Sequence, residues 1–284
     1  MAYSNLTCTF APLILYTMQP FSGKTVWITG ASSGIGEALV KSFAKRGCRI
    51  VLTARREQEL LRVQKEAGLT NETSLVLPLD LYHTEGMAHS IAKINEKFGA
   101  IDILVCNAGI AQRFSVVEST MEVNRQVMEL NFFSVIALVK TVLPGMLEKK
   151  SGRIVVISSV MGKIGMPGSS MYCASKHALQ GFFDALRAEV YKDTVGVTVI
   201  CPGYIKTNVS INAVTAEGGA HGKMDKGKEK GMAPEKCAEG ILYAIAKGKD
   251  EFMIGGKELL AVTFSRLFPS LFLRVIKRVA PTRH

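Results

Sequence analysis

Short apolar runs rich in β-branched residues alternate with longer segments whose apolar positions recur at helical spacing. Most of the short runs are continuously apolar, which is typical of strands buried on both faces of a sheet. Amphipathic segments of helical length, such as 37–46 and 174–191, lie between them. This alternation predicts right-handed crossovers and an α/β fold with a doubly wound parallel sheet. The seven predicted strands are 25–29, 49–53, 74–79, 101–106, 153–158, 197–201 and 251–254.

We find no internal repeat and no linker, so we expect a single domain over residues 21–256. Residues 1–20 are interpreted as an N-terminal extension, because their apolar stretch is too short to span a bilayer and lacks the basic start of a signal peptide. Residues 208–236 follow the sixth strand and are rich in Gly and Lys. We expect a lid over a substrate site there, with a solvated loop as the alternative.

The composition narrows the range of ligands. The formal charge of the 284 residues is +11, but no basic run is interleaved with aromatic residues, so we expect no nucleic-acid partner. The remaining explanations of the positive charge are a phosphate-bearing ligand and an anionic membrane surface. The six cysteines are scattered without metal-ligand spacing, which favours reduced thiols, no bound metal and a reducing compartment. We therefore expect the cytoplasm, or the cytosolic face of a membrane, rather than secretion.

A glycine-rich stretch, TGASSGIG at 29–36, joins the first strand to a helix that begins near Ile35. Glycine allows a tight turn and a close approach of the backbone to a ligand, and a helix N-terminus favours an anion. The spacing of Gly30, Gly34 and Gly36 differs from the general dinucleotide pattern, so a plain strand–helix turn is the alternative.

The end of the second strand indicates which dinucleotide would bind. An acid there would hold the ribose hydroxyl of NAD, whereas an arginine would accept the 2′-phosphate of NADP. Arg55 and Arg56 occupy this place, and Glu57 comes too late to act as the acid. We therefore predict NADP(H), with Arg55 as the main contact and Ser32 or Ser33 assisting. Two exposed arginines at a helix start are the alternative.

A candidate catalytic set follows the fifth predicted strand. Tyr172 and Lys176 are four residues apart on a predicted helix, and Ser159 ends the strand before it. A neighbouring ammonium lowers the pKa of a phenol, which would suit Tyr172 to exchange a proton with a ketone or an alcohol. Ser159 could hydrogen-bond the same oxygen, and a nicotinamide would carry the hydride.

Together these motifs resemble the short-chain dehydrogenase/reductase family from about residue 23 to 256. Further family-like motifs are the aspartate of LPLDL, NAG at 107–109, the asparagine of ELNFF and PGYIKTN at 202–208. The resemblance implies a Rossmann fold and an acid–base Tyr172. It implies that Lys176 also binds the nicotinamide ribose and that Asn131 holds a relay water. The coenzyme-binding residues it implies are Gly30, Ser32, Ser33, Gly34, Ile35, Gly36, Arg55, Asp80, Asn107, Tyr172, Lys176, Pro202, Gly203, Ile205 and Thr207.

The stretch 202–225 is similar to the dehydrogenase/reductase 7B-like subgroup, near the hydroxysteroid dehydrogenases. That likeness implies an NADP-dependent enzyme of lipid metabolism, acting on a steroid-, retinoid- or glycerolipid-precursor-like ketone or alcohol. Three methionines and an isoleucine, Met161, Ile164, Met166 and Met171, would suit an adaptable apolar pocket. Family habit implies a homodimer or homotetramer. A non-catalytic NADP-binding scaffold is the alternative function.

The last segment, 257–284, is predicted to be a basic amphipathic tail. Phe264, Phe268, Phe272 and Ile276 recur every four residues and are flanked by basic residues. Two interpretations stay open: a helix packed on protein, or a helix lying on an anionic membrane surface. Pro269 and the charges argue against a bilayer-spanning helix.

Overall fold

The computed structural model describes residues 21–209, 211, 213–216, 218–219, 222 and 229–278. The predicted extension at 1–20, parts of the predicted lid and the last six residues of the tail lie outside this set. The strands are β1 (Thr25–Thr29), β2 (Arg49–Ala54), β3 (Ser74–Pro78), β4 (Ile103–Cys106), β5 (Gly152–Ile157), β6 (Val195–Pro202) and β7 (Glu251–Ile254). The helices are α1 (Gly34–Ala44), α2 (Glu57–Glu66), α3 (Met87–Phe98), α4 (Met121–Met128), α5 (Ser134–Glu148), α6 (Ser170–Glu189), α8 (Pro234–Ala246), α9 (Leu259–Leu267) and α10 (Pro269–Ile276).

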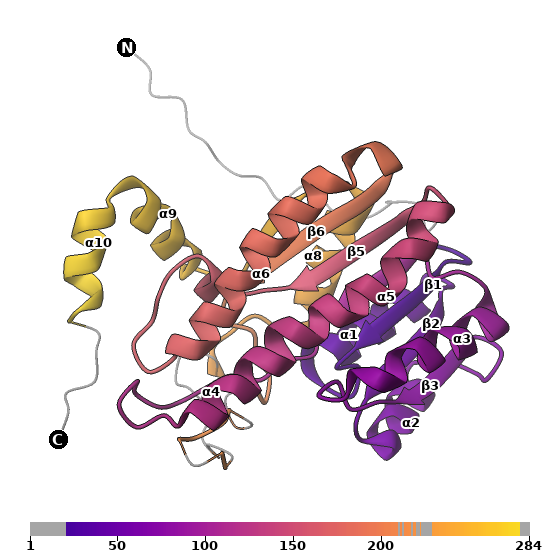
Figure 1. Cartoon of the computed structure of the whole chain (residues 1–284), viewed down its shortest axis with the longest axis horizontal. Helices are drawn as coiled ribbons and strands as arrows, with labels where there is room; N and C mark the ends of the chain where they lie inside the picture. Colours follow the sequence, from indigo (N-terminus) through magenta and orange to yellow (C-terminus); the bar gives the residue numbers. More distant parts are fainter. Residues whose placement is uncertain are drawn as a thin grey trace.

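The seven strands form one parallel sheet in the order β3-β2-β1-β4-β5-β6-β7, which confirms the predicted doubly wound fold. Helices cover both faces (Figure 1). One buried cluster joins the sheet to α1, α2 and α8, and a second joins it to α3, α5 and α6. Alternate side chains of one strand enter different clusters, as Val26 and Trp27 do, because strand side chains point to opposite faces.

The order of the strands reverses between β1 and β4. From β1 the chain winds outward to β2 and β3, and it then crosses back to β4 on the other side of β1. In such a sheet the loops at the carboxyl ends of these two strands separate and leave a crevice for a ligand. The fold therefore places the glycine-rich stretch at the edge of that crevice.

The element boundaries differ from the predicted ones by a few residues at most sites. The largest difference with a visible cause is at α6, which begins at Ser170 rather than Ala174. The buried Gln112 side chain accepts hydrogen bonds from the backbone N–H groups of Met171 and Tyr172, at 2.7 and 3.0 Å. This cap comes from a loop 58 residues earlier, so local sequence pattern does not reveal it.

One helical stretch of the described chain, Met121–Glu148, is long and apolar enough to cross a bilayer. It comprises α4, a π-helical turn η2 (Glu129–Phe133) and α5. Leu138, Val139 and Val142 of α5 are buried against the sheet in the second cluster. This packing is that of a core helix, which length and composition do not distinguish from a spanning helix.

Asp102 holds the amino-terminal edge of the sheet together. Its carboxylate accepts hydrogen bonds from the backbone N–H of Thr25 (2.9 Å) and the ammonium groups of Lys149 (2.7 Å) and Lys24 (3.2 Å). Burial raises the pKa of Asp102, but these three donors outweigh burial, and the pKa lies below its usual value. The ionised carboxylate therefore stabilises the fold.

Asp102→Asn is expected to lower the free energy of unfolding at pH 7 by roughly 1–3 kcal/mol, because an amide group faces three donors with one acceptor. Since the folded pKa is depressed, the stabilisation is present at neutral pH and is lost as pH falls below about 4. Denaturant titration of both proteins between neutral and acid pH measures it. Asp184→Asn, which removes an exposed ion pair with Arg187, is the control. If the loss of unfolding free energy in Asp102→Asn were as large at acid pH as at neutral pH, this account would be contradicted.

Candidate active site

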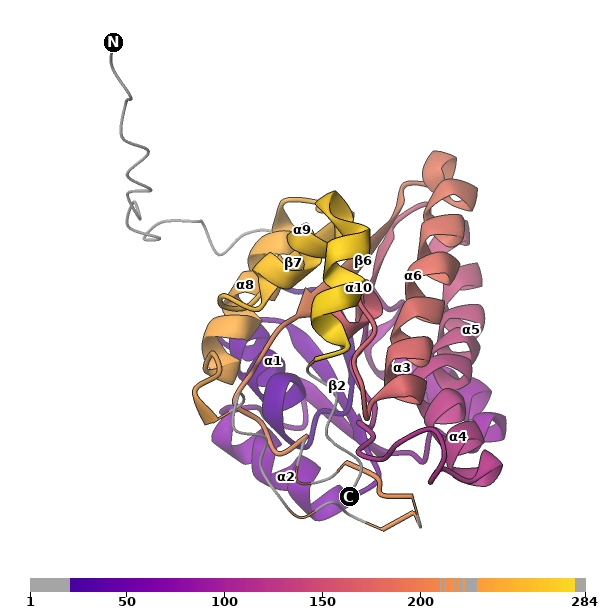
Figure 2. The same ribbon diagram turned by 90° about the vertical axis from the view of Figure 1, so that its left-hand side faces the viewer.

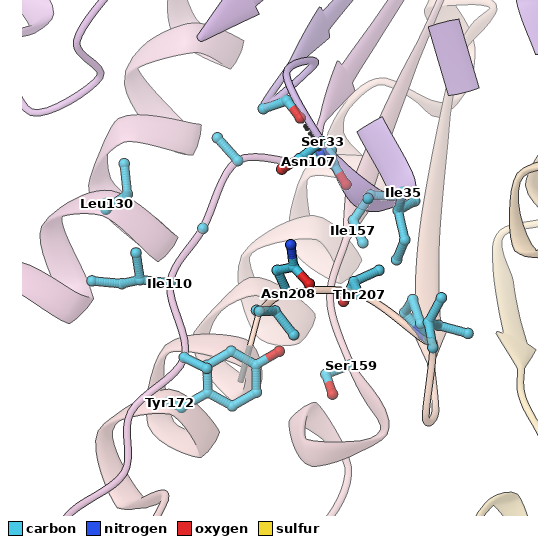
Figure 3. A pocket seen from close by; sticks show the side chains of 18 of the residues that line it. Ser33, Ile35, Asn107, Ile110, Leu130, Ile157, Ser159, Tyr172, Thr207 and Asn208 are labelled. Carbon is cyan, nitrogen blue, oxygen red and sulfur yellow. Dashed lines mark hydrogen bonds between the residues drawn. The ribbon is translucent and has the colours of Figure 1, made fainter. Parts of the chain in front are cut away.

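A cavity of about 540 Å³ lies along the carboxyl ends of the strands. It is lined by the glycine-rich loop after β1, the end of β2, the loop after β4, the end of β5, the first turn of α6 and the loop after β6. Figure 3 shows Ser33, Ile35 and Asn107 toward one end, and Tyr172 and Ser159 on two sides of the other. All the predicted catalytic and coenzyme-binding residues line it except Gly36 and Asn131.

The glycine-rich loop passes very close to its neighbours. Gly30 and Gly34 have positive φ angles of 65° and 59°, which L side chains rarely adopt. A Cβ on Gly30 would stand 2.9 Å from the Asn107 side chain, and one on Gly36 would stand 2.1 Å from the Gly30 carbonyl oxygen. Gly36 thus lets α1 start directly behind the loop, which aims the free N–H groups of the helix at the cavity.

Asn107 and Thr29 tie the loop to the centre of the sheet. The Thr29 hydroxyl accepts hydrogen bonds from the backbone N–H groups of Asn107 (3.0 Å) and Ala108 (3.2 Å). The Asn107 amide donates in turn to the carbonyls of Thr29 and Gly30, at 3.0 and 3.3 Å. The NAG motif therefore braces the ends of β1 and β4 beside the cavity.

Two cations and one acid lie at the end of the cavity next to β2. Arg55 and Arg56 are exposed and line it, whereas Glu57 starts α2 outside the lining. Asp80, after β3, also lines the cavity, and its carboxylate accepts the backbone N–H of Tyr82 at 3.1 Å. The charges at this end would favour an added phosphate on a bound nucleotide.

Ser159, Tyr172 and Lys176 meet at the other end. Ser159 follows β5 and caps the turn η3 (Val160–Gly162) by accepting the Met161 N–H at 3.1 Å. Lys176 is buried, donates to the Ile157 carbonyl at 2.9 Å and holds its Nζ 5.8 Å from the centre of the Tyr172 ring. Figure 3 shows the Tyr172 hydroxyl pointing into the cavity on the side of Ser159.

Desolvation dominates the acid–base behaviour of this set. Burial raises the pKa of Tyr172, against the nearby Ser159 hydroxyl and the positive charge of Arg113. Burial lowers the pKa of Lys176 to about 8. The expectation that the Lys176 ammonium lowers the pKa of Tyr172 is therefore not met in this arrangement, because burial has the largest effect on the Tyr172 pKa and raises it. A protonated phenol at neutral pH suits Tyr172 to donate a proton.

Asn131 lies in the π-helical turn η2, fully buried behind the cavity wall. Its amide oxygen accepts the Ile110 N–H at 2.8 Å, and its amide nitrogen donates to the Ile110 carbonyl (2.9 Å) and the Ser175 hydroxyl (3.1 Å). The side chain thus joins the loop after β4 to α6. A relay water at Asn131 stays a prediction.

The loop after β6 closes the cavity. Pro202 ends the strand, Gly203, Ile205 and Thr207 line the cavity, and the Thr207 methyl lies 3.1 Å from where a Cβ on Gly34 would stand. In the predicted lid, Val214 hydrogen-bonds the backbone of Ala111 and Arg113 at 2.9 and 3.0 Å. The described part of the lid therefore joins the loop after β4, next to the cavity; its role at the substrate stays a prediction.

Three functional neighbours were missed by the sequence analysis. Gln112 caps the helix that carries Tyr172, Arg113 lines the cavity, and the Glu258 carboxylate accepts the N–H of Tyr204 at 2.7 Å. Gln112 and Arg113 lie shortly after the NAG motif, and this position in the chain could have marked them as neighbours of the site. No signal marked Glu258, because it is 54 residues from Tyr204 in the chain.

With this geometry in place, comparison with known proteins identifies the class. The family model for short chain dehydrogenase matches residues 24–218. The chain belongs to the short-chain dehydrogenase family, a family of oxidoreductases that bind a nicotinamide coenzyme.

Named relatives refine this assignment. The chain is 44% identical to a dehydrogenase/reductase SDR family protein 7-like of Anopheles gambiae, covering 91% of this chain and 84% of the relative. It is 40% identical to dehydrogenase/reductase SDR family member 7B of Bos taurus, covering 88% and 79%. These relatives confirm the predicted family and subgroup resemblance.

Solved structures show the same fold. A short-chain dehydrogenase from Streptomyces avermitilis aligns with a TM-score of 0.77 at 27% identity, covering 90% of this chain and 98% of that one. A short chain dehydrogenase/reductase from Burkholderia phymatum in complex with NAD aligns with a TM-score of 0.79 at 23% identity, covering 88% and 95%. At that identity the second structure supports the fold alone.

Gly36→Ala is expected to weaken NADPH binding by more than about tenfold, because the new methyl group collides with the Gly30 carbonyl and displaces the loop from the anion. Fluorescence titration with NADPH measures the change. Gly181→Ala is the control, since a Cβ there meets no atom within 4 Å. Equal NADPH affinity in the two variants would show that the close approach at Gly36 does not shape the coenzyme site.

Proposed function

We propose that this chain is an NADP(H)-dependent oxidoreductase that interconverts a ketone and a secondary alcohol on a lipophilic substrate. The observation that carries the proposal is the convergence of Ser159, Tyr172 and Lys176 on one end of a cavity whose other end is a glycine-rich loop beside Arg55. This arrangement suits a ligand that is anionic at one end and reactive at the other.

The residues present fit a phosphorylated dinucleotide. Gly30 and Gly34 line the cavity where α1 begins, and Gly36 lets the helix start close behind them. A helix N-terminus favours an anion such as the pyrophosphate of a dinucleotide. Arg55 and Arg56 supply the guanidinium groups that match phosphate geometry, and Glu57 lies outside the lining. These features support NADP(H) over NAD(H).

A bound reduced nicotinamide would supply the hydride for this reaction. Tyr172 donates its proton to the ketone oxygen as negative charge develops there, and its raised pKa keeps that proton available at neutral pH. Ser159 donates a hydrogen bond to the same oxygen, which stabilises the developing charge. Lys176, fixed on the Ile157 carbonyl, is the group expected to bind the ribose.

The lipophilic substrate class is supported by the remaining cavity wall. Ala111, Val160, Met161 and Val209 line the cavity together with Tyr172. Pockets lined mainly by apolar side chains, with only a few polar groups, are typical of sites that bind lipophilic ligands.

Tyr172→Phe is expected to bind NADPH as the wild type does and to lose about 10²–10⁴-fold in ketone turnover, because the proton donor is gone while the ring remains. Decay of NADPH absorbance with a panel of lipophilic ketones measures turnover. Tyr191→Phe, at a residue that is 81% exposed, is the matched control. If wild type and Tyr172→Phe bound NADPH but were equally inert across the panel, the scaffold function would replace this proposal.

Arg55→Ala is expected to weaken NADPH at least tenfold more than NADH, since only NADPH carries the phosphate that a guanidinium binds. Dissociation constants for both coenzymes measure the ratio. Arg125→Ala, which removes an exposed charge on α4 outside the cavity lining, controls for the loss of positive charge. An equal loss for the two coenzymes would contradict the phosphate assignment.

A further inference from the structure

The last two helices form a hairpin that exposes many large apolar side chains. We call residues 259–278, comprising α9, α10 and the two residues after α10, the C-terminal hairpin. Figure 1 shows it at the edge of the molecule, and in Figure 2 it stands in front of the sheet. Six large apolar side chains of the hairpin are exposed, between 45% and 68%: Leu260, Leu267, Phe268, Leu271, Leu273 and Val275.

Other side chains hold the hairpin against the rest of the protein. Val262, which is 1% exposed, packs in a cluster with Val160 and Ile164. The two helices also contact each other through rings: Phe264 lies 5.9 Å from Phe268 and 6.2 Å from Phe272, centre to centre. The hairpin is therefore folded against the protein and still exposes large apolar side chains that the fold does not cover.

All the charged side chains of the hairpin are positive. From residue 259 to 278 there is no acidic residue, and the cations are Arg266, Arg274, Lys277 and Arg278. Within the described chain none of these four forms an ion pair. Apolar side chains bordered by unpaired cations form the pattern of a helix that lies in the interface of an anionic membrane.

A second copy of the chain is a poorer occupant for this surface. A symmetric dimer contact brings the same patch of both subunits together, so the four cations of one hairpin would face the four of the other. An anionic lipid surface offers the opposite charge and an apolar layer at the depth that Leu271 and Phe268 can reach. Charge complementarity therefore favours lipid.

We propose that the C-terminal hairpin docks the protein on an anionic lipid surface, from which its substrate enters the cavity. The second clause rests on the proposed function. Val160 contacts the hairpin and also lines the catalytic cavity. Glu258, directly before α9, binds the N–H of Tyr204, which lines the same cavity. Docking through the hairpin therefore holds the cavity wall close to the lipid.

The test is flotation of the full chain with phosphatidylcholine vesicles, with and without phosphatidylserine. The wild type should bind mainly the anionic vesicles. Leu271→Ser with Val275→Ser should weaken binding about tenfold or more through lost apolar burial. Arg274→Gln with Lys277→Gln should weaken it by a similar factor on the anionic vesicles only. Leu61→Ser, at a leucine with the same 47% exposure as Leu271 but on α2, should bind as the wild type does.

Docking would be contradicted if the wild type did not bind anionic vesicles, or if both hairpin variants bound them as the wild type does. It would also be contradicted if Leu61→Ser weakened vesicle binding as much as the hairpin variants do. A change in oligomeric state on mutation of Leu271 and Val275, measured by sedimentation, would assign the surface to a protein partner instead.

Turnover separates this proposal from the proposed function. The hairpin variants should oxidise NADPH normally with a water-soluble ketone and lose rate only with a ketone carried in vesicles. A loss with both substrates would contradict entry from lipid. If the wild type reduced no ketone at all, the proposed function would fail, while the vesicle-binding result would still decide docking.

Discussion

The ends of β1 and β4 lie against the start of α1, and the coenzyme groove depends on how closely these segments approach. Asn107 donates two hydrogen bonds to Thr29 across the two strand ends, one from its backbone N–H and one from its side-chain amide. Gly30 and Gly36 leave room for this contact, because a Cβ on either would overlap its neighbours. Since the chain leaves the two strands in opposite directions, the same contact opens the crevice in which a ligand lies. Fold and binding site thus share one steric constraint.

Desolvation sets the state of the catalytic groups once the groove is formed. The crevice that admits a hydride donor also removes water from Tyr172 and Lys176, so the phenol holds its proton and the pKa of the amine falls to about 8. Hydrogen bonds fix where both groups point: Gln112 caps the helix that carries them, and the Ile157 carbonyl holds the Lys176 ammonium. The site is therefore arranged for the proton donation of the proposed reaction before a substrate binds.

The basic residues of the chain have different roles in different parts of the structure. Arg55 and Arg56 border the cavity, where a guanidinium can match a phosphate. The cations of the C-terminal hairpin are near exposed apolar side chains. In the proposed docking they would act through diffuse attraction to an anionic surface, which depends less on geometry. Other cations are structural, as Arg62 is when it bonds Glu37, Glu59 and Glu66 between α1 and α2. Net charge alone does not separate these uses.

The sequence by itself determined the parallel sheet, the glycine-rich loop after β1, and the Ser159, Tyr172 and Lys176 set at the carboxyl edge. Each depends on local patterns: continuous apolar runs, glycine spacing, and side chains one helical turn apart. Only the tertiary structure decided that Gln112 caps α6 and that the Asn131 side chain binds Ile110 and Ser175. It also decided that burial outweighs Ser159 and Arg113 in setting the Tyr172 pKa. It also decided which side of the hairpin is covered. These outcomes depend on contacts between distant segments and on the water they exclude, and an apolar stripe has the same spacing whether its partner is protein, lipid or solvent.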